Sequence, residues 1–297
     1  MRTSIAITNF SWSAGSAIEA ELARIARIAD DTGIDTVFLA DHLVQLEPGT
    51  EPTEPMLEAY TTLGYLAAST TRVRLGTLVA AVTMRPPAVL VKAATTLDVL
   101  SGGRAWFGIG AGYQQDEADG MGVPLPPTAE RFEWLEDTLR LAHRMWSGDD
   151  APFSGKRVHA TRPLGSPPPV GTPHPPVLVG GTGETKTLRL VAEYADACNL
   201  PDLPDDGAQL RHKLTVLARH CAAAGRPLDA IEKTVSTRLA PDEPAASLLE
   251  RADALAALGL DHLIVFTRGP WTPQTLTTVA AASPAIGELS AARHDKE

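Results

Sequence analysis

The sequence predicts a single α/β domain with the architecture of a (β/α)8 TIM barrel. Eight short apolar segments alternate with helical patterns along the 297 residues. The apolar segments are continuous runs, as expected for strands of a parallel sheet that is covered on both faces. No linker divides the chain, and this favours one barrel over an open, doubly wound sheet of two halves. We assign residues 1–289 to the barrel and residues 290–297 to a polar tail.

The first half of the chain supplies four pairs of strand and helix. The strands are expected at residues 2–8, 35–40, 73–82 and 104–109. Ile18, Leu22, Ile25 and Ile28 recur at the spacing of one helix face, and Gly33 ends that first helix. The other helices are expected at residues 56–69, 88–100 and about 132–146.

A proline-rich segment at residues 148–176 interrupts the alternation. It contains the run Pro167-Pro168-Pro169, and we interpret it as an extended insertion before the fifth strand. Long segments of this kind inside compact domains are usually functional. The remaining strands are expected at residues 177–179, 196–200, 231–238 and 261–266. Their helices are expected at about residues 184–194, 206–224, 248–258 and 274–282.

Composition excludes several classes of function. The net charge of −10 disfavours a surface for nucleic acid or for an anionic membrane. No apolar run has the length of a membrane span, and the first residues lack the pattern of a signal peptide. The two cysteines form no disulfide framework, and no His or Cys cluster has the spacing of metal ligands. We therefore expect a cytoplasmic protein that binds no metal.

Residues 177–184 predict a strand, a glycine corner and the start of a helix. In this pattern the backbone N–H groups of Gly181, Thr182 and Gly183 are free at a helix N-terminus, where the helix dipole favours an anion. Glycine leaves that backbone accessible because it has no Cβ atom. In such barrels the active site lies at the C-terminal ends of the strands, so this corner is expected on the active-site rim. The sequence thus indicates a phosphate-binding loop, with a simple turn as the alternative.

Asp41 and His42 follow the second strand and are the best candidates for acid–base chemistry. A carboxylate beside a histidine can set its tautomer and charge, so we expect Asp41 to orient His42. The alternative is that Asp41 caps a turn and His42 packs.

Weaker candidates for a substrate pocket come from the ends of other strands. They are Tyr113, Glu117, Cys198 and Asn199. Glu117 lies in the acidic run 114–119, which we interpret as a solvated face, although its place after the fourth strand keeps it a candidate. We interpret Cys198 as a small buried hydrophobe rather than a nucleophile. Arg238 and Arg268 are open between binding an anion and lying on a solvated surface.

The residues at the strand ends resemble those of the luciferase-like monooxygenase superfamily, and within it the deazaflavin-dependent branch that uses coenzyme F420. The resemblance spans nearly the whole chain. It is carried by residues 38–42, 74–79, 97–104, 108–112, 175–181 and 195–199. Each segment alone is weak, but together and in this order they are fairly specific.

The resemblance implies that the cofactor ring lies over the C-terminal mouth of the barrel. Leu78-Val79 match the place of a bulge with a non-proline cis peptide that backs the ring. The corner at 180–183 matches the loop that holds the cofactor phosphate. The cofactor-binding residues implied in this way are Asp41, Leu78, Val79, Ala111, Gly112, Gly180, Gly181, Thr182 and Gly183.

The function implied is hydride transfer between coenzyme F420 and a small organic substrate, with His42, oriented by Asp41, exchanging the accompanying proton. The loop 44–55 and the proline-rich insertion would roof the substrate. Tyr113 stands where sugar-phosphate dehydrogenases of the family carry a glutamate, and Leu46 where they carry a tryptophan, which speaks against sugar-phosphate oxidation.

Other functions remain open at this point. An FMN-dependent monooxygenase that uses dioxygen and a non-catalytic flavin-binding or deazaflavin-binding barrel fit the same fold. An unrelated phosphate-binding barrel enzyme is a further alternative, although no strand ends in the lysine that an aldolase would need. The partner expected is a small-molecule substrate, and apolar barrel faces are compatible with a homodimer.

Overall fold

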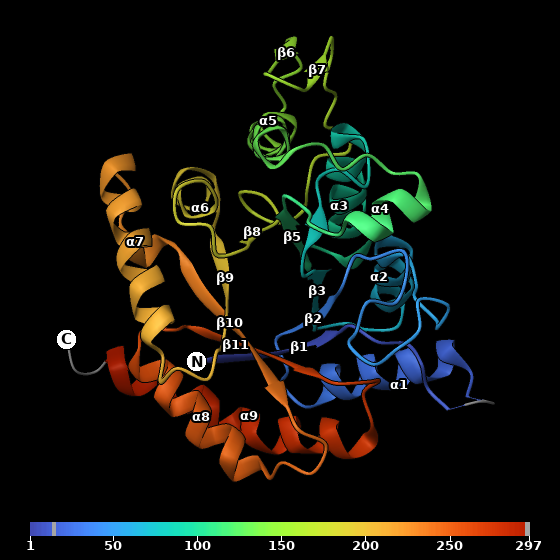
Figure 1. Ribbon diagram of the computed structural model, residues 1–297, viewed down its shortest axis with the longest axis vertical. Coiled ribbons are helices and arrows are strands. Elements are labelled where there is room, and N and C mark those ends of the chain that lie inside the picture. Colours follow the sequence, from blue (N-terminus) through green and yellow to red (C-terminus); the bar gives the residue numbers. More distant parts are fainter. Residues whose placement is uncertain (14–15, 295–297) are drawn as a thin grey trace.

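The structure is a computed structural model that describes residues 1–13 and 16–294. Its parallel strands close into an eight-stranded barrel, as predicted (Figure 1). The strands are β1 (Arg2–Ile7), β2 (Thr36–Leu39), β3 (Arg74–Thr77), β4 (Ala80–Ala81), β5 (Ala105–Gly110), β8 (Val177–Gly180), β9 (Ala197–Pro201), β10 (Glu232–Leu239) and β11 (His262–Thr267). Pairing runs from β3 through β2, β1, β11, β10, β9 and β8 to β5, and β3 also pairs with β5, which closes the barrel.

The third strand of the barrel is divided into β3 and β4. We expected one strand over 73–82, but the peptide between Leu78 and Val79 is cis and separates the two pieces. β3 pairs with the beginning of β5, and β4 pairs with Ile109 and Gly110 at its end. The bulge and the cis peptide that the family resemblance implied are therefore present at Leu78-Val79.

Helices surround the barrel (Figure 1). They are α1 (Ile18–Asp31), α2 (Ala59–Ala68), α3 (Pro87–Ser101), α4 (Gln115–Met121), α5 (Thr128–Trp146), α6 (Thr187–Tyr194), α7 (Ala208–Ala224), α8 (Ala245–Ala257) and α9 (Pro273–His294), with a short 3-10 turn, η1, at Leu228–Ala230. The apolar side chains of the helices pack against the outward-facing side chains of the strands, and together they form the larger hydrophobic core. No described helix combines the length and the apolar character that crossing a membrane would require.

Three helices differ from the expectations. The acidic run 114–119 forms α4, which Gln115 and Asp119 stabilise by a hydrogen bond one turn apart and which Gly122 ends in a left-handed conformation. α6 begins at Thr187 rather than Glu184, because Leu188 N–H reaches back to Gly183 and the residues between form a wider turn. α9 continues through Pro284 into the expected tail as far as His294, and residues 295–297 lie outside the described residues.

Large side chains fill the interior of the barrel. Phe38 and Trp106 lie there in a second core with Ala6, Leu178, Ala197 and Ile264. Gly76 faces Trp106, and a Cβ atom on Gly76 would lie 2.6 Å from the Trp106 Cβ. Glycine at this position lets the indole fit between neighbouring strands.

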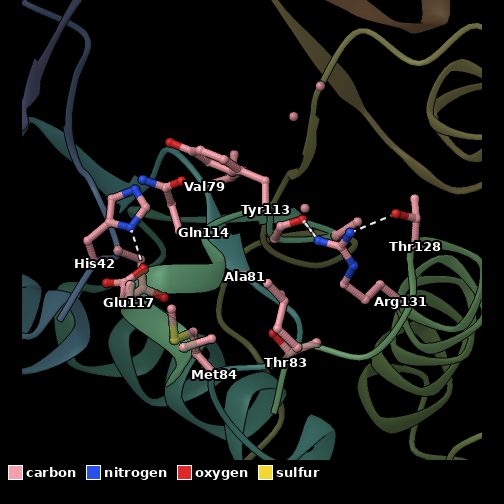
Figure 2. Close-up of a pocket in the computed structure, with 18 of the residues that line it drawn as sticks. His42, Val79, Ala81, Thr83, Met84, Tyr113, Gln114, Glu117, Thr128 and Arg131 are labelled. Carbon is pink, nitrogen blue, oxygen red and sulfur yellow. Dashed lines mark hydrogen bonds and ion pairs between the residues drawn. The ribbon is translucent and has the colours of Figure 1, made fainter. Parts of the chain in front are cut away.

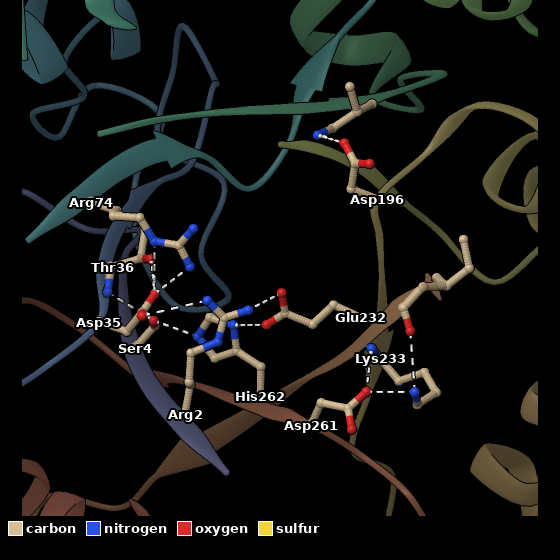
Figure 3. Close-up of polar contacts among 12 residues, drawn as sticks. Arg2, Ser4, Asp35, Thr36, Arg74, Asp196, Glu232, Lys233, Asp261 and His262 are labelled. Carbon is tan, nitrogen blue, oxygen red and sulfur yellow. Dashed lines mark hydrogen bonds and ion pairs between the residues drawn. The ribbon is translucent and has the colours of Figure 1, made fainter. Parts of the chain in front are cut away.

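A polar cluster closes the N-terminal end of the barrel (Figure 3). The imidazole of His262 is fully buried there, 2.7 Å from Glu232 and 2.6 Å from the Ser4 hydroxyl. Asp35 accepts hydrogen bonds from Arg74 and forms an ion pair with Arg2. Burial alone would raise the pKa of Asp35, but the charges of Arg74, His262 and Arg2 outweigh it and bring the pKa to about 2. The cluster thus joins strands from both halves of the chain.

The proline-rich insertion is anchored to the outside of the barrel. It contains a small hairpin, β6 (Phe153–Ser154) and β7 (His159–Ala160), which lies beyond α5 in Figure 1. Buried Asp98 of α3 accepts hydrogen bonds from the backbone N–H groups of Val170 and Gly171, at 2.7 and 2.9 Å. Buried Asp137 of α5 binds the backbone at 157 and 158 in the same way. The expectation that the insertion roofs the substrate is wrong, because two helices hold it away from the barrel mouth.

Candidate active site

A cavity of about 450 Å³ opens at the C-terminal end of the strands (Figure 2). Its floor comes from the Leu78-Val79 bulge, and its walls come from the ends of β2, β5, β8 and β9 together with α4, α5 and the start of α6. Of the residues singled out by sequence, it is lined by Asp41, His42, Leu78, Val79, Ala111, Gly112, Tyr113, Glu117, Gly180, Gly181 and Asn199. A cavity of this size suits a small organic ligand.

Other residues singled out by sequence lie outside this cavity. Thr182 and Gly183 are exposed just beyond the corner, so their contact with a phosphate stays a prediction. Cys198 is fully buried in the core between sheet and helices, where burial raises the pKa of its thiol to about 12. It is a buried hydrophobe, as interpreted, and does not line a substrate pocket. Arg238 lies over the ring of Phe266, and Arg268 is exposed.

Asn199 faces the barrel interior because side chains alternate along β9. Its amide donates to the Thr234 hydroxyl at 2.9 Å and accepts from the Ser236 hydroxyl at 3.0 Å, so both ends of the amide are held. The neighbouring Cys198 points the opposite way, toward the helices.

Val79 explains why two of the rim positions are glycine. A Cβ atom on Gly180 would lie 2.8 Å from the Val79 Cγ2, and one on Gly110 would lie 2.9 Å from the same atom. The bulge therefore pushes the Val79 side chain against two strand ends that have no side chains. Gly181 follows with φ of 120°, a conformation that other residues rarely adopt. The result is a close-packed corner with its backbone accessible from the cavity.

His42 is paired with Glu117, which α4 turns inward (Figure 2). The Nδ1 atom of His42 lies 2.9 Å from Oε2 of Glu117, and the backbone N–H of Leu43 donates to Oε1 at 2.5 Å. The Glu117 side chain is 0% exposed, so the interpretation of this position as a solvated face is wrong. Burial would raise the pKa of Glu117, but the hydrogen bonds from His42 and Leu43 lower it overall.

Asp41 is bound by Arg85 rather than by His42. The two guanidinium nitrogens donate to the two carboxylate oxygens of Asp41 at 2.6 and 2.8 Å, and Arg85 also contacts Glu58. Glu58 in turn caps the N-terminus of α2 by accepting from the backbone of Tyr60 and Thr61. The expectation that Asp41 orients His42 is therefore wrong, because Arg85, from the loop after β4, binds both carboxylate oxygens of Asp41.

Arg131 is a cavity residue that the sequence reasoning missed. It lies across the cavity from His42 and donates to the carbonyl of Gly112 and the hydroxyl of Thr128 (Figure 2). Its Nε atom is buried and has no hydrogen-bond partner among the described residues. The signal that could have found it is a basic residue in the first turn of the long helix that follows the strand-four glycines.

Tyr113 stands at the mouth of the cavity. Its side chain is largely solvent-accessible, with the residue 70% exposed, and its ring meets the ring of His42 edge-on at 6.0 Å. Partial desolvation at the cavity mouth, together with the charge of Glu117, raises the pKa of Tyr113. No cluster of three or more potential metal ligands is found in the described part of the chain.

Comparison with known proteins gives this site a family context. Residues 1–295 match the luciferase-like monooxygenase family. The chain is 32% identical over 249 residues to the F420-dependent glucose-6-phosphate dehydrogenase of Kineococcus radiotolerans, covering 81% of this chain and 69% of that protein. The protein of the same name from Nakamurella multipartita is 29% identical over 241 residues, with the same coverage of 81% and 69%.

Solved structures share the fold at low sequence identity. An F420-dependent secondary alcohol dehydrogenase in complex with an F420-acetone adduct superposes with a TM-score of 0.81 at 16% identity, over 96% of this chain and 99% of that one. EDTA monooxygenase from Chelativorans sp. BNC1 superposes with a TM-score of 0.79 at 17% identity, over 97% and 94%. These likenesses show the barrel fold.

Proposed function

The chain belongs to the luciferase-like monooxygenase family, and from this we propose that it is an oxidoreductase that transfers a hydride between coenzyme F420 and a small organic substrate. One observation carries the proposal. A single cavity brings together the Leu78-Val79 bulge, the Gly180-Gly181 corner and the His42–Glu117 pair. The two relatives named above as F420-dependent enzymes support the choice of cofactor.

The residues of the cavity fit a flat cofactor with an anionic tail. Leu78 and Val79 offer an apolar floor, and the glycine corner leaves backbone N–H groups without covering side chains. The unpartnered Nε of Arg131 adds a hydrogen-bond donor on the side of the cavity away from His42. Coenzyme F420, when bound, supplies the hydride chemistry, and the protein supplies position and electrostatics.

His42 would exchange the proton that accompanies the hydride. Among the described residues that line the cavity, it carries the imidazole, the side chain that most often serves as a general acid or base; Tyr113 offers a phenol as the other candidate. Asp41 lines the same cavity, but both of its carboxylate oxygens bind Arg85, so we keep it as a residue beside the cofactor and give it no part in proton exchange.

The substrate we propose carries no phosphate. Arg131 is the lining residue with a permanent positive charge among those described, and it lies on the side opposite His42 (Figure 2). Tyr113 and Leu46 also differ from the residues expected in sugar-phosphate dehydrogenases. A phosphate beside His42 would therefore meet the carboxylate of Glu117 and the phenol of Tyr113 rather than a free cation.

An FMN-dependent monooxygenase is the second candidate, because the glycine corner would serve the phosphate of either cofactor. Titrating the protein with F420 and with FMN, followed by fluorescence, tests the choice. Tighter binding of F420 is expected. Tighter binding of FMN with flavin-dependent oxygen uptake would overturn the proposal. Binding of F420 with no turnover over a panel of substrates would indicate a non-catalytic barrel. Binding of neither cofactor would overturn both the F420-dependent and the FMN-dependent assignment.

We also propose that α2 and α3 form the interface of a homodimer. A surface groove between α2, α3 and the insertion is lined by exposed apolar side chains. Val89 is 55% exposed, Leu100 is 72% exposed and Leu164 of the insertion is 51% exposed. Exposed apolar side chains that cluster in this way mark interaction surfaces. Sedimentation equilibrium tests this, because Leu100→Glu is expected to give a monomer and Glu288→Gln, on α9, is not.

A further inference from the structure

Glu117 determines which nitrogen of His42 is available for chemistry. A neutral histidine carries one N–H, and the nitrogen that holds it donates while the other accepts. We propose that Glu117 is a positioning residue that keeps this proton on Nδ1 and so leaves the Nε2 lone pair as the atom that exchanges a proton with the substrate. The reaction in which this exchange takes part is the proposed function above, whereas the proton position is argued from the surroundings of Glu117 in the protein without cofactor.

The contacts define Glu117 as an acceptor. Its Oε1 accepts from the backbone N–H of Leu43, so the carboxylate is oriented by a group that can only donate. Its pKa is lowered overall, because the hydrogen bonds from His42 and Leu43 outweigh burial. Acceptance from the Leu43 N–H favours the ionised carboxylate, which has no proton to give, so we assign the Nδ1 atom of His42, 2.9 Å from Oε2, as the donor.

Among the described residues, Glu117 is the one that forms a hydrogen bond to the His42 ring. Asp41 is adjacent in sequence, but both its oxygens are taken up by Arg85. Tyr113 meets the His42 ring with its edge, at 6.0 Å between ring centroids, and forms no hydrogen bond to it among those found. The position of the proton on His42 is therefore set from α4.

The same carboxylate fixes the direction of the ring. Glu117 holds the side chain of His42 and the backbone of the next residue, so rotation of the imidazole would break the contact to Oε2 while Oε1 stays bound. The His42 side chain is 24% exposed and lines the cavity, so Nδ1 is engaged while the ring remains accessible to a ligand. A histidine held in this way needs no reorganisation before it reacts.

The chemistry balances in either direction. When a substrate with a C–H bond beside an O–H or N–H group is oxidised, the C–H electron pair leaves as hydride to the cofactor. The heteroatom proton goes to Nε2, and a C=O or C=N bond forms in the substrate. The carboxylate of Glu117 stabilises the imidazolium produced, and reduction returns the same proton from Nε2.

Amide substitution is the informative change. Glutamine has the size of glutamate, but Leu43 and His42 bind different oxygens of Glu117, and glutamine can present its oxygen to one of them only while its NH2 group faces the other. If the amide NH2 group faces His42, it favours the opposite tautomer. Asp119→Asn is the matched control, because this substitution removes the same charge from the same helix. Asp119 is exposed, and its side chain accepts a hydrogen bond from Gln115 rather than from His42.

The test is a long-range ¹H–¹⁵N correlation spectrum of histidine-labelled protein, without any cofactor. The chain has 8 histidines, and His42→Gln identifies the signal of His42. With the imidazole neutral, wild-type protein and Asp119→Asn are expected to show Nδ1–H with a bare Nε2, and Glu117→Gln is expected to show a large Nε2–H population. Thermal unfolding checks that the three variants are folded.

Two results would overturn the proposal: a proton on Nε2 in the wild-type protein, or the same tautomer in Glu117→Gln as in the wild type. Should Glu117→Gln fail to fold, Glu117→Asp replaces it, because the shorter side chain cannot span both contacts and is expected to mix the tautomers. Failure to bind F420 would leave the tautomer result intact, so loss of the proposed function and loss of the positioning role are separate outcomes.

Discussion

Arg85 binds both carboxylate oxygens of Asp41, at 2.6 and 2.8 Å, and so separates this acid from the histidine that follows it in sequence. The Asp41 side chain is 1% exposed and that of Arg85 is 16% exposed, so the pair is largely shielded from water. Two acids next to His42 therefore have different tasks. Asp41 is neutralised in a structural ion pair, and Glu117 is left to the histidine.

Breaking this ion pair should be costly. Asp41→Asn is expected to lower the free energy of unfolding by about 3–5 kcal/mol, because it leaves the charge of Arg85 buried with less compensation. Denaturant unfolding measures the change. Since Glu58 also contacts Arg85, the double variant Asp41→Asn with Arg85→Met should be less destabilised than the single one. An unchanged midpoint for Asp41→Asn would contradict the role of the pair.

Gly180→Ala should disturb the Leu78-Val79 bulge in the floor of the proposed cofactor site. The new Cβ atom would lie 2.8 Å from Val79 Cγ2, so one of the two segments must move. Binding of F420, followed by fluorescence, is expected to weaken at least tenfold, and Val79→Ala in the same chain should restore part of it. Gly64→Ala is the control, because a Cβ atom there meets nothing within 4 Å and removal of a helical glycine stabilises by about 0.5–1 kcal/mol. Equal affinity of Gly180→Ala and wild type would show that the contact is not required.

Stability should fall in acid through the polar cluster that contains Asp35. The pKa of this carboxyl is about 2 in the folded chain against an ordinary 3.8, so its contribution is complete above the unfolded value and is lost as the pH falls from about 4 to 2. The shift corresponds to about 2 kcal/mol. Asp35→Asn should therefore be less stable at pH 7 and lose less stability in this range.

Urea unfolding between pH 2 and 7 checks this dependence, with Asp119→Asn as a control for the loss of one exposed carboxylate. A pH profile of Asp35→Asn parallel to that of the wild type would contradict the assignment.

Asp98→Ala should loosen the insertion without closing or opening the cavity. The buried carboxylate binds the backbone of Val170 and Gly171, and the insertion contributes no residue to the cavity wall among those described. Limited proteolysis is expected to cut the variant faster within residues 163–176, while the affinity for F420 stays within about twofold, the spread expected between independent sites. Loss of F420 binding in a folded variant would mean that the insertion does reach the site.

The sequence by itself determined the order and type of the barrel elements and the location of His42 on the active-site rim, whereas the place of the Leu78-Val79 bulge came from the family resemblance. These features depend on local patterns, because a continuous apolar run, a glycine corner or a proline cluster acts on its immediate neighbours. The boundaries of α6 and α9 and the formation of α4 were less accessible, since capping and tertiary packing decide them.

Only the tertiary structure decided which side chains meet. Glu117 reaches His42 across 75 positions of sequence, and Arg85 reaches Asp41 across 44. Closure of the barrel brings these strand ends together, and the alternation of side chains along β9 turns Asn199 inward and Cys198 outward. The hydrogen bonds and charges that meet each buried group then outweigh its burial, as the lowered pKa of Glu117 shows. The sequence indicates Glu117, in an acidic run, as a solvated residue. It becomes the buried partner of the histidine because α4 turns it toward His42 and Leu43, which follow β2.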